Sequence, residues 1–248
     1  MFDQRTRAPS TPKAPPQGPV SARVGLKQRW VQLQGRMLFL LVTLVLLIFI
    51  RPFFSEQSVL LGFFLAALLL GTLYAISRGD RRVFIIAVAL GGPHVGAIWL
   101  GRLVLGNVGY LIGVVFGLLF YGFVALILLR YILRAPTVTA DMLYGAASVY
   151  FLLGLVWAMA FVLVEMQHPG SLSIERPGPL AWDDFMYYSF VTLTTLGYGD
   201  ITPLTQSARS LAILEAITGV FYTTMLVARL VGLYLVQLTL RQTGNEQP

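Results

Sequence analysis

Long apolar segments alternate with short polar ones along most of this chain. Segments long enough to cross a bilayer as helices lie near residues 37–54, 59–77, 83–101, 108–129, 142–165 and 209–238. A helix needs roughly twenty mostly apolar residues to span the hydrocarbon core of a membrane. A further amphipathic segment, 182–195, falls between the last two and is too short to span. The pattern therefore predicts an all-α membrane protein with six transmembrane helices and one re-entrant loop between the fifth and the sixth.

The composition supports this interpretation, because 56% of the 248 residues are hydrophobic and only 12% are charged. Soluble domains carry about 25% charged residues. The net charge of +7 comes mainly from basic residues before the first crossing, between the second and third, and after the fourth and the last. If the crossings alternate, these basic segments share one side, so both termini are predicted to be cytoplasmic in the cell membrane. The distribution favours contact with membrane lipids over nucleic-acid binding, and the absence of cysteine excludes disulfides.

The chain divides by composition into five parts. They are a disordered tail, a possible interfacial helix, a four-helix membrane domain of unknown role, a C-terminal membrane domain and a short polar tail: 1–20, 21–36, 37–134, 142–240 and 241–248. In the second part Leu26, Trp30 and Leu33 recur at helical spacing opposite basic residues. This spacing suits a helix lying on the inner membrane face, and a basic linker is the alternative.

The motif Thr-Thr-Leu-Gly-Tyr-Gly-Asp occupies residues 194–200, just after the short amphipathic segment. A row of backbone carbonyl oxygens that replaces the hydration shell of an ion requires successive carbonyls to turn the same way. Alternate residues must then take left-handed dihedrals, which cost little only for glycine. Gly197 and Gly199 stand at alternate positions, and Thr195 can add a hydroxyl oxygen. The loop is therefore predicted to bind a dehydrated potassium ion.

This motif resembles the filter of the potassium channel family, and residues 142–240 resemble its pore module. The resemblance implies an outer helix, a pore helix over 183–195, a filter over 195–199 and an inner helix over 209–238. Potassium, the permeant ion, would bind the backbone carbonyls and one threonine hydroxyl of Thr195, Leu196, Gly197, Tyr198 and Gly199. The residues expected to support this filter are Thr194, Asp200, Tyr187, Tyr188 and Thr192. One filter per chain implies a homotetramer around a fourfold axis.

Two positions depart from the family pattern. Some bacterial relatives place a glutamate on the pore helix to pair with the aspartate at the mouth, and here that position is Val191, so Asp200 lacks that partner. Glu215 lies inside the last apolar segment, where a carboxylate is costly and therefore a functional hypothesis. We expect it to accept hydrogen bonds behind the filter, from Thr192 or Tyr188. Pairing with an arginine or reaching the membrane interface are the alternatives.

The last helix carries candidate gating positions. Gly219 falls where the family often has a hinge, although close packing against the pore helix would equally require glycine. Thr223, Val227 and Val231 recur at a spacing of four and are expected to line the inner cavity and gate. A hydrophobic constriction there would close the pore by dewetting.

The first four helices give fewer signals. Residues 108–129 contain no charged residue, so the chain lacks the arginine repeat of a voltage sensor and is predicted not to be strongly voltage-gated. Residues 91–94, Gly-Gly-Pro-His, are expected to break or kink the third helix. His94 there would sense protons or bond to a carbonyl that the kink frees.

Other functions fit the sequence less well. A non-selective cation channel is the nearest alternative, and it should lack a filter glycine or the tyrosine. A secondary transporter should show matched broken helices in two repeats. No nucleophile with a paired base, metal-ligand cluster or phosphate-binding loop indicates an enzyme.

Overall fold

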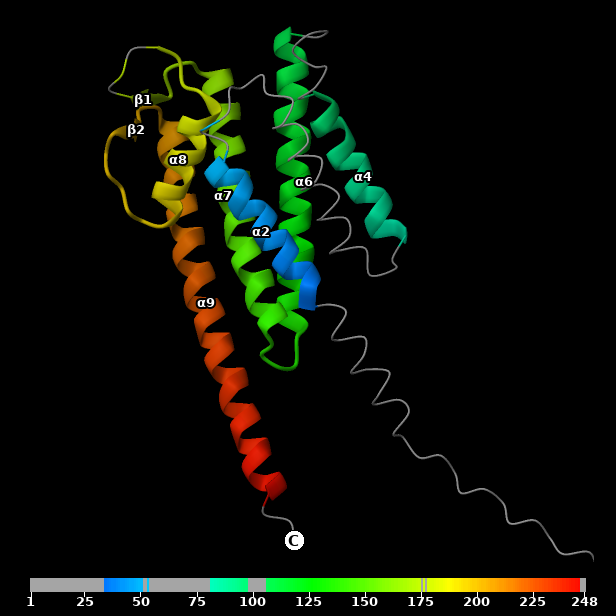
Figure 1. Ribbon diagram of the computed structural model, residues 1–248. Helices are drawn as coiled ribbons and strands as arrows, with labels where there is room; N and C mark the ends of the chain where they lie inside the picture. Colours follow the sequence, from blue (N-terminus) through cyan, green and yellow to red (C-terminus); the bar gives the residue numbers. More distant parts are fainter. Residues whose placement is uncertain are drawn as a thin grey trace, which may run out of the picture.

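The computed structural model describes residues 34–50, 53, 81–97, 106–174, 176 and 178–245. The described part is mostly helical, and its helices are α2 Gln34–Ile50, α4 Arg81–Gly96, α6 Gly106–Arg134, α7 Ala140–Gln167, α8 Trp182–Leu193 and α9 Gln206–Asn245. Two short strands, β1 Leu172–Ile174 and β2 Ile201–Pro203, form an antiparallel pair. Figure 1 shows α6, α7 and α9 running along one another, with α8 and the strands gathered at one end.

Three described helices are long and apolar enough to cross a membrane: Gly106–Arg134, Ala140–Gln167 and Gln206–Thr239. They confirm the last three predicted crossings as long apolar helices. The described parts of the first and third crossings, α2 and α4, have 17 and 16 residues. The second crossing, 59–77, lies outside the described residues, as do the tail 1–20 and nearly all of 21–36. The six-crossing layout therefore stays a prediction.

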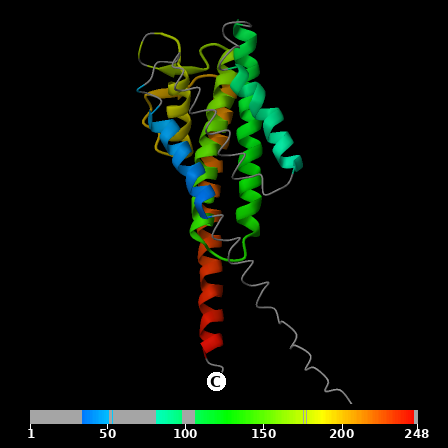
Figure 2. The ribbon, with the colours of Figure 1, turned by 45° about the vertical axis from the view of Figure 1, so that its right-hand side comes forward.

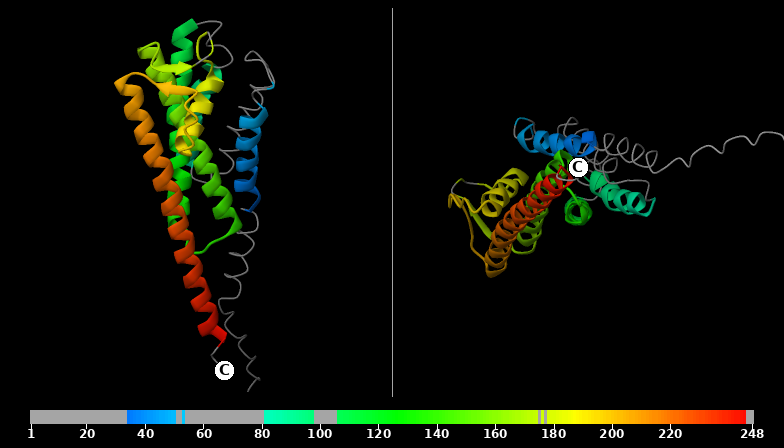
Figure 3. Two further views of the ribbon diagram at one scale, coloured as in Figure 1. Left: turned by 90° about the vertical axis from the view of Figure 1, so that its left-hand side faces the viewer. Right: turned by 90° about the horizontal axis from the view of Figure 1, so that it is seen from below.

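Helix α7 lies at the centre of the described fold, in contact with α2, α6, α8 and α9. From α2, an apolar stripe of Met37, Leu40, Leu44 and Leu47 is buried. These residues follow the spacing that places side chains on one helix face. In Figure 3, α2 lies along one side of the bundle and α9 along the other.

The two strands close the loops that flank α8. After α7, the carboxylate of Glu165 accepts the N–H of Gly170 at 2.7 Å and the N–H of Leu172 at 3.1 Å. Ser173 then pairs with Thr202 in the strand register. The segment before α8 is thereby joined to the segment after the filter motif, which fixes both ends of the stretch that contains α8 and this motif.

Helix α4 packs on α6, away from α9 (Figure 2). It continues through Pro93 to Gly96, so the helix is not broken there, and the alternative of a kink stays a prediction. His94 is buried, with Nδ1 2.7 Å from the Gly113 carbonyl oxygen and Nε2 3.3 Å from the Tyr121 hydroxyl. That carbonyl belongs to α6 and not to a kink in α4. Small residues on α6 explain the contact, because a Cβ on Gly117 would lie 2.5 Å from the imidazole.

Helix α9 is the least covered long helix. Only 11% of its most apolar stretch is buried within the chain, against 44% for α6 and 50% for α7. Its lower half extends past the turn between α6 and α7 (Figure 1). Large apolar side chains exposed along it include Ile213, Ile217, Val220, Phe221, Met225, Val227 and Val231. Within the described part of the chain, this apolar face of α9 is largely uncovered.

Candidate functional site

The candidate site is the filter motif, residues 194–200, which directly follows helix α8. The start of α8 is fixed by an acidic side chain. Asp184 Oδ2 accepts the backbone N–H of Ala181 at 2.7 Å and forms an ion pair with Arg176. Carboxylates in a first turn satisfy free N–H groups and suit the positive end of the helix dipole. The helix ends at Leu193, two residues before the predicted end at 195. It ends there because Thr195 leaves the right-handed region, with φ of +58°.

The backbone of the filter motif alternates in handedness. Thr195, Gly197 and Gly199 have φ of +58°, +59° and +84°. Both glycines therefore take the left-handed dihedrals that a row of aligned carbonyls requires. Thr195 is not a glycine, and a left-handed conformation costs such a residue roughly 1–2 kcal/mol. Thr195 is the one described residue other than glycine with positive φ.

The N–H groups of the motif turn back onto α8. Leu196 and Gly197 both donate to the Val191 carbonyl, at 2.9 and 3.4 Å, and Thr195 donates to Thr192 O at 2.9 Å. Within the described ranges, no loop or turn hydrogen bond between backbone groups ends on a carbonyl of residues 195–199. These oxygens are thus available to an external partner. The side chains of Leu196 and Tyr198 are 55% and 68% exposed on the single chain.

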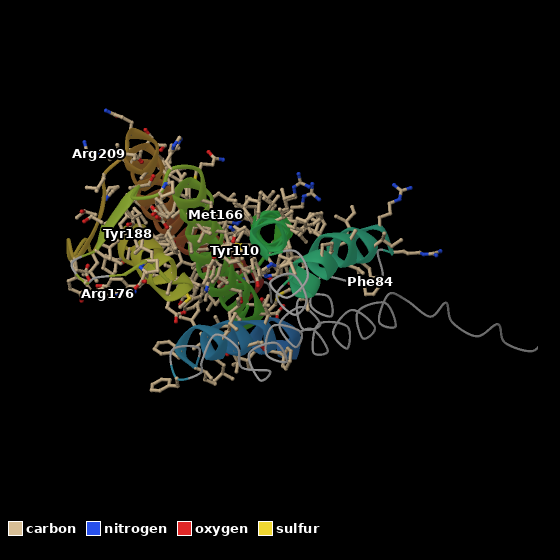
Figure 4. The ribbon with its side chains drawn as sticks, turned by 90° about the horizontal axis from the view of Figure 1, so that it is seen from above. Phe84, Tyr110, Met166, Arg176, Tyr188 and Arg209 are labelled. Carbon is tan, nitrogen blue, oxygen red and sulfur yellow. The ribbon has the colours of Figure 1, made fainter. Side chains whose placement is uncertain are left out.

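The two tyrosines expected behind the filter have different roles. Tyr187 donates its hydroxyl to Asp200 Oδ2 at 2.8 Å, and this bond raises the pKa of the Tyr187 hydroxyl. Asp200 therefore gains a tyrosine partner in place of the family's glutamate. Tyr188 is buried and packs edge-on against Phe161 of α7, with ring centroids 4.8 Å apart. It fastens α8 to α7, and Figure 4 shows it within the group formed by α7, α8 and α9.

Glu215 is fully buried, as its place in α9 suggested, but its expected partners were wrong. Among the described residues, the hydrogen-bond partner of Glu215 is Ser189 and neither Thr192 nor Tyr188. Glu215 Oε1 lies instead 2.5 Å from Ser189 Oγ, which also lies 2.7 Å from the carbonyl oxygen of Gly154 on α7. Ser189 therefore lies where α8 contacts both α7 and α9. A small hydroxyl in an aromatic segment gave no sequence signal for this position.

Gly219 is a packing position in this structure. A Cβ there would lie 2.0 Å from the carbonyl oxygen of Leu193, the last residue of α8. The same oxygen accepts the hydroxyl of Tyr150 on α7 at 3.3 Å. Helix α9 is continuous through Gly219. The close-packing alternative therefore accounts for this glycine, and a hinge is not needed to explain it.

Arg229 is a residue that the sequence analysis missed. Its guanidinium donates to the carbonyls of Ile132 at 3.3 Å, Leu133 at 2.5 Å and Ala135 at 3.0 Å. These carbonyls lie at and just after the C-terminal end of α6, where a cation also suits the helix dipole. Val227 and Val231 are exposed, and their assignment to the gate stays a prediction. Arg229 ties α9 to the membrane helices that precede the site.

Comparison with known proteins supports a channel. A family model described as an ion channel matches residues 146–235. Protein LctB of Bacillus caldotenax is 32% identical over 127 residues, which cover 45% of this chain and 92% of that protein. The chain belongs to the ion channel family. No solved structure matches it. The family match contains all of the α8 site, so the site belongs to a membrane channel.

Gly219→Ala is expected to destabilise the channel by about 1–3 kcal/mol, because the added methyl group would overlap the Leu193 carbonyl. Gly232→Ala is the matched control on the same helix, where nothing lies within 4 Å of the added Cβ. Unfolding in detergent, followed by circular dichroism, measures both free energies. Equal stability of the two variants would contradict the packing role.

Arg229→Gln is expected to lower the free energy of unfolding by about 1–2 kcal/mol, since charged hydrogen bonds to the α6 carbonyls are lost. Arg130→Gln, at an exposed arginine near the same helix end, should change it by less than about 0.5 kcal/mol. The same denaturation assay compares the two. If the Arg229→Gln protein is as stable as the Arg130→Gln protein, the hydrogen bonds from Arg229 to the α6 carbonyls contribute nothing to stability.

Proposed function

We propose that this protein is a potassium-selective channel that conducts passively through a pore formed by four identical chains. The observation that carries the proposal is the backbone of the filter motif. Positive φ at Thr195, Gly197 and Gly199 alternates with residues whose φ is not positive, while N–H groups of the loop bond back to α8. This combination frees a consecutive set of carbonyl oxygens, which is what a dehydrated potassium ion requires.

The proposed ion sites lie between rings of oxygen contributed by each chain. The carbonyls of Thr195, Leu196, Gly197 and Tyr198 would supply them, with the Thr195 hydroxyl at the inner end and Gly199 at the mouth. The C-terminal end of α8 carries partial negative charge and would favour a cation in the central cavity. Thr194, Asp200 and Tyr187 would hold the loop in place.

The surface of the single chain supports assembly with further copies. Leu196 and Tyr198 of the filter have exposed apolar and aromatic side chains, and the described part of the chain leaves most of the apolar face of α9 uncovered. A filter motif that occurs once in the sequence can ring a pore only when several chains contribute it. A homotetramer with fourfold symmetry satisfies both requirements.

Membrane placement follows from the charge pattern. With basic segments on the inner side, both termini would be cytoplasmic and the filter would open outward in the cell membrane. Exposed Val227 and Val231 would face the inner pore and form its constriction. Strong voltage gating is not expected, because 108–129 carries no charge.

Two alternatives make different predictions. A non-selective cation channel would pass sodium as readily as potassium. A secondary transporter would move its substrate against a gradient, and membership of the ion channel family counts against it. Both are outcomes of the same transport measurement.

We expect liposomes containing the purified channel to pass potassium at least about a hundredfold faster than sodium, because the carbonyl rings replace the hydration shell of potassium better than that of sodium. Gly199→Ala should abolish this selectivity by straining a filter position with φ of +84°. Gly170→Ala is the matched control, since Gly170 has the same φ of +84° and equally open space but lies outside the filter.

A fluorescent flux assay with each ion gradient in turn measures the three proteins. Gly170→Ala should keep wild-type selectivity. Equal sodium and potassium flux through the wild-type protein would refute potassium selectivity.

A further inference from the structure

Three helices meet at the hydroxyl of one pore-helix residue. Ser189 Oγ lies 2.7 Å from the carbonyl oxygen of Gly154 on α7 and 2.5 Å from Glu215 Oε1 on α9. Both Ser189 and Glu215 are fully buried. The packing is tight, because a Cβ on Gly154 would lie 2.5 Å from the ring of Phe190. The contact joins α8 to both of the helices that enclose it.

A count of hydrogens fixes the chemistry of this contact. A serine hydroxyl has a single hydrogen and can donate to only one acceptor. The Gly154 carbonyl can only accept, so it takes the Ser189 hydrogen. An ionised Glu215 would then place a second acceptor at 2.5 Å with no hydrogen between the oxygens. A protonated Glu215 resolves this conflict, because it donates its own hydrogen to Ser189 Oγ.

The surroundings of Glu215 agree with the neutral form. Among the described residues, its Oε2 has no hydrogen-bond partner. The titratable groups that face it are two phenols, Tyr150 on α7 and Tyr188 on α8. The hydroxyl of Tyr150 donates to the Leu193 carbonyl at 3.3 Å and not to Glu215. No lysine or arginine in the described part of the chain pairs with Glu215, and an uncompensated buried charge is expensive.

We propose that Glu215 is a positioning residue that acts as a neutral carboxylic acid. Its carboxyl group donates a hydrogen bond to Ser189 and so holds the pore helix in the position that supports the filter. The inference rests on the proposed function for its effect on conduction. Ser189 lies one helical turn before Leu193, where α8 ends and the filter loop begins. Loss of the proton places two acceptors against one hydroxyl, which separates α8 from α7 or α9. The filter then loses its support, and conduction falls as the acid ionises.

The decisive comparison uses Glu215→Gln and Glu215→Ala. A glutamine amide donates N–H to Ser189 Oγ as the neutral acid does, and it has no proton to lose. Glu215→Gln should therefore keep wild-type potassium flux and potassium-to-sodium ratio, and its flux should be independent of pH. Glu215→Ala leaves Ser189 without this donor, and its flux should drop by roughly tenfold or more. Thermal unfolding shows that each variant is folded.

Infrared spectroscopy of the reconstituted protein tests the proton directly, without any transport. The wild-type protein should show a protonated carboxyl band at neutral pH that is absent from Glu215→Gln. As the pH is raised, wild-type flux should fall over the range in which that band disappears. Because the band is measured without ion flux, it stays informative even if the protein does not select potassium.

Two results would overturn the inference. One is the absence of a Glu215 carboxyl band at neutral pH, which would mean that the group is ionised. The other is a folded Glu215→Gln channel that loses its flux, which would mean that the negative charge itself is required.

Discussion

The structure depends on the hydrogen bonds that turn the filter backbone onto the end of α8. Leu196 and Gly197 donate to Val191 O, and in the described part of the chain no loop backbone N–H donates to a carbonyl of residues 195–199. The turn demands left-handed φ at alternate residues, two of which are glycines. It also demands that α8 end at a fixed place. Gly219 and Tyr150 meet the last carbonyl of α8, and Ser189 joins it to both neighbours. The conformation of this loop is thus a product of helix packing as much as of its own sequence.

Helices α2 and α6 are joined to the pore helices α7 and α9 by two separate sets of contacts. Helix α7 packs against α6 and α2 along its length. Below, Arg229 of α9 binds the carbonyls at the end of α6. Any movement of α6 relative to the pore must therefore act on the same helix that carries Val227 and Val231. This connection gives the N-terminal helices a physical route to the conducting part of an ion channel.

Features that follow from local pattern were predictable from the sequence, and those that depend on which helix faces meet were not. Apolar length predicted the last three crossings, and the alternating glycines predicted the handedness at Gly197 and Gly199. The partners of Glu215 and Asp200 required knowing the rotation of α8 about its axis. That rotation places Ser189, and not Thr192, toward α9, and Tyr187 toward the mouth. The role of Arg229 was missed because its partners are backbone carbonyls nearly a hundred residues earlier in the chain.

The central claim is that four copies of this loop enclose one ion path. Electron cryomicroscopy of the purified protein in potassium tests it most directly. A particle with fourfold symmetry is predicted, with ion density on the axis between rings of carbonyl oxygens from residues 195–198. A particle without that symmetry, or one in which these loops face away from a common axis, would contradict the account.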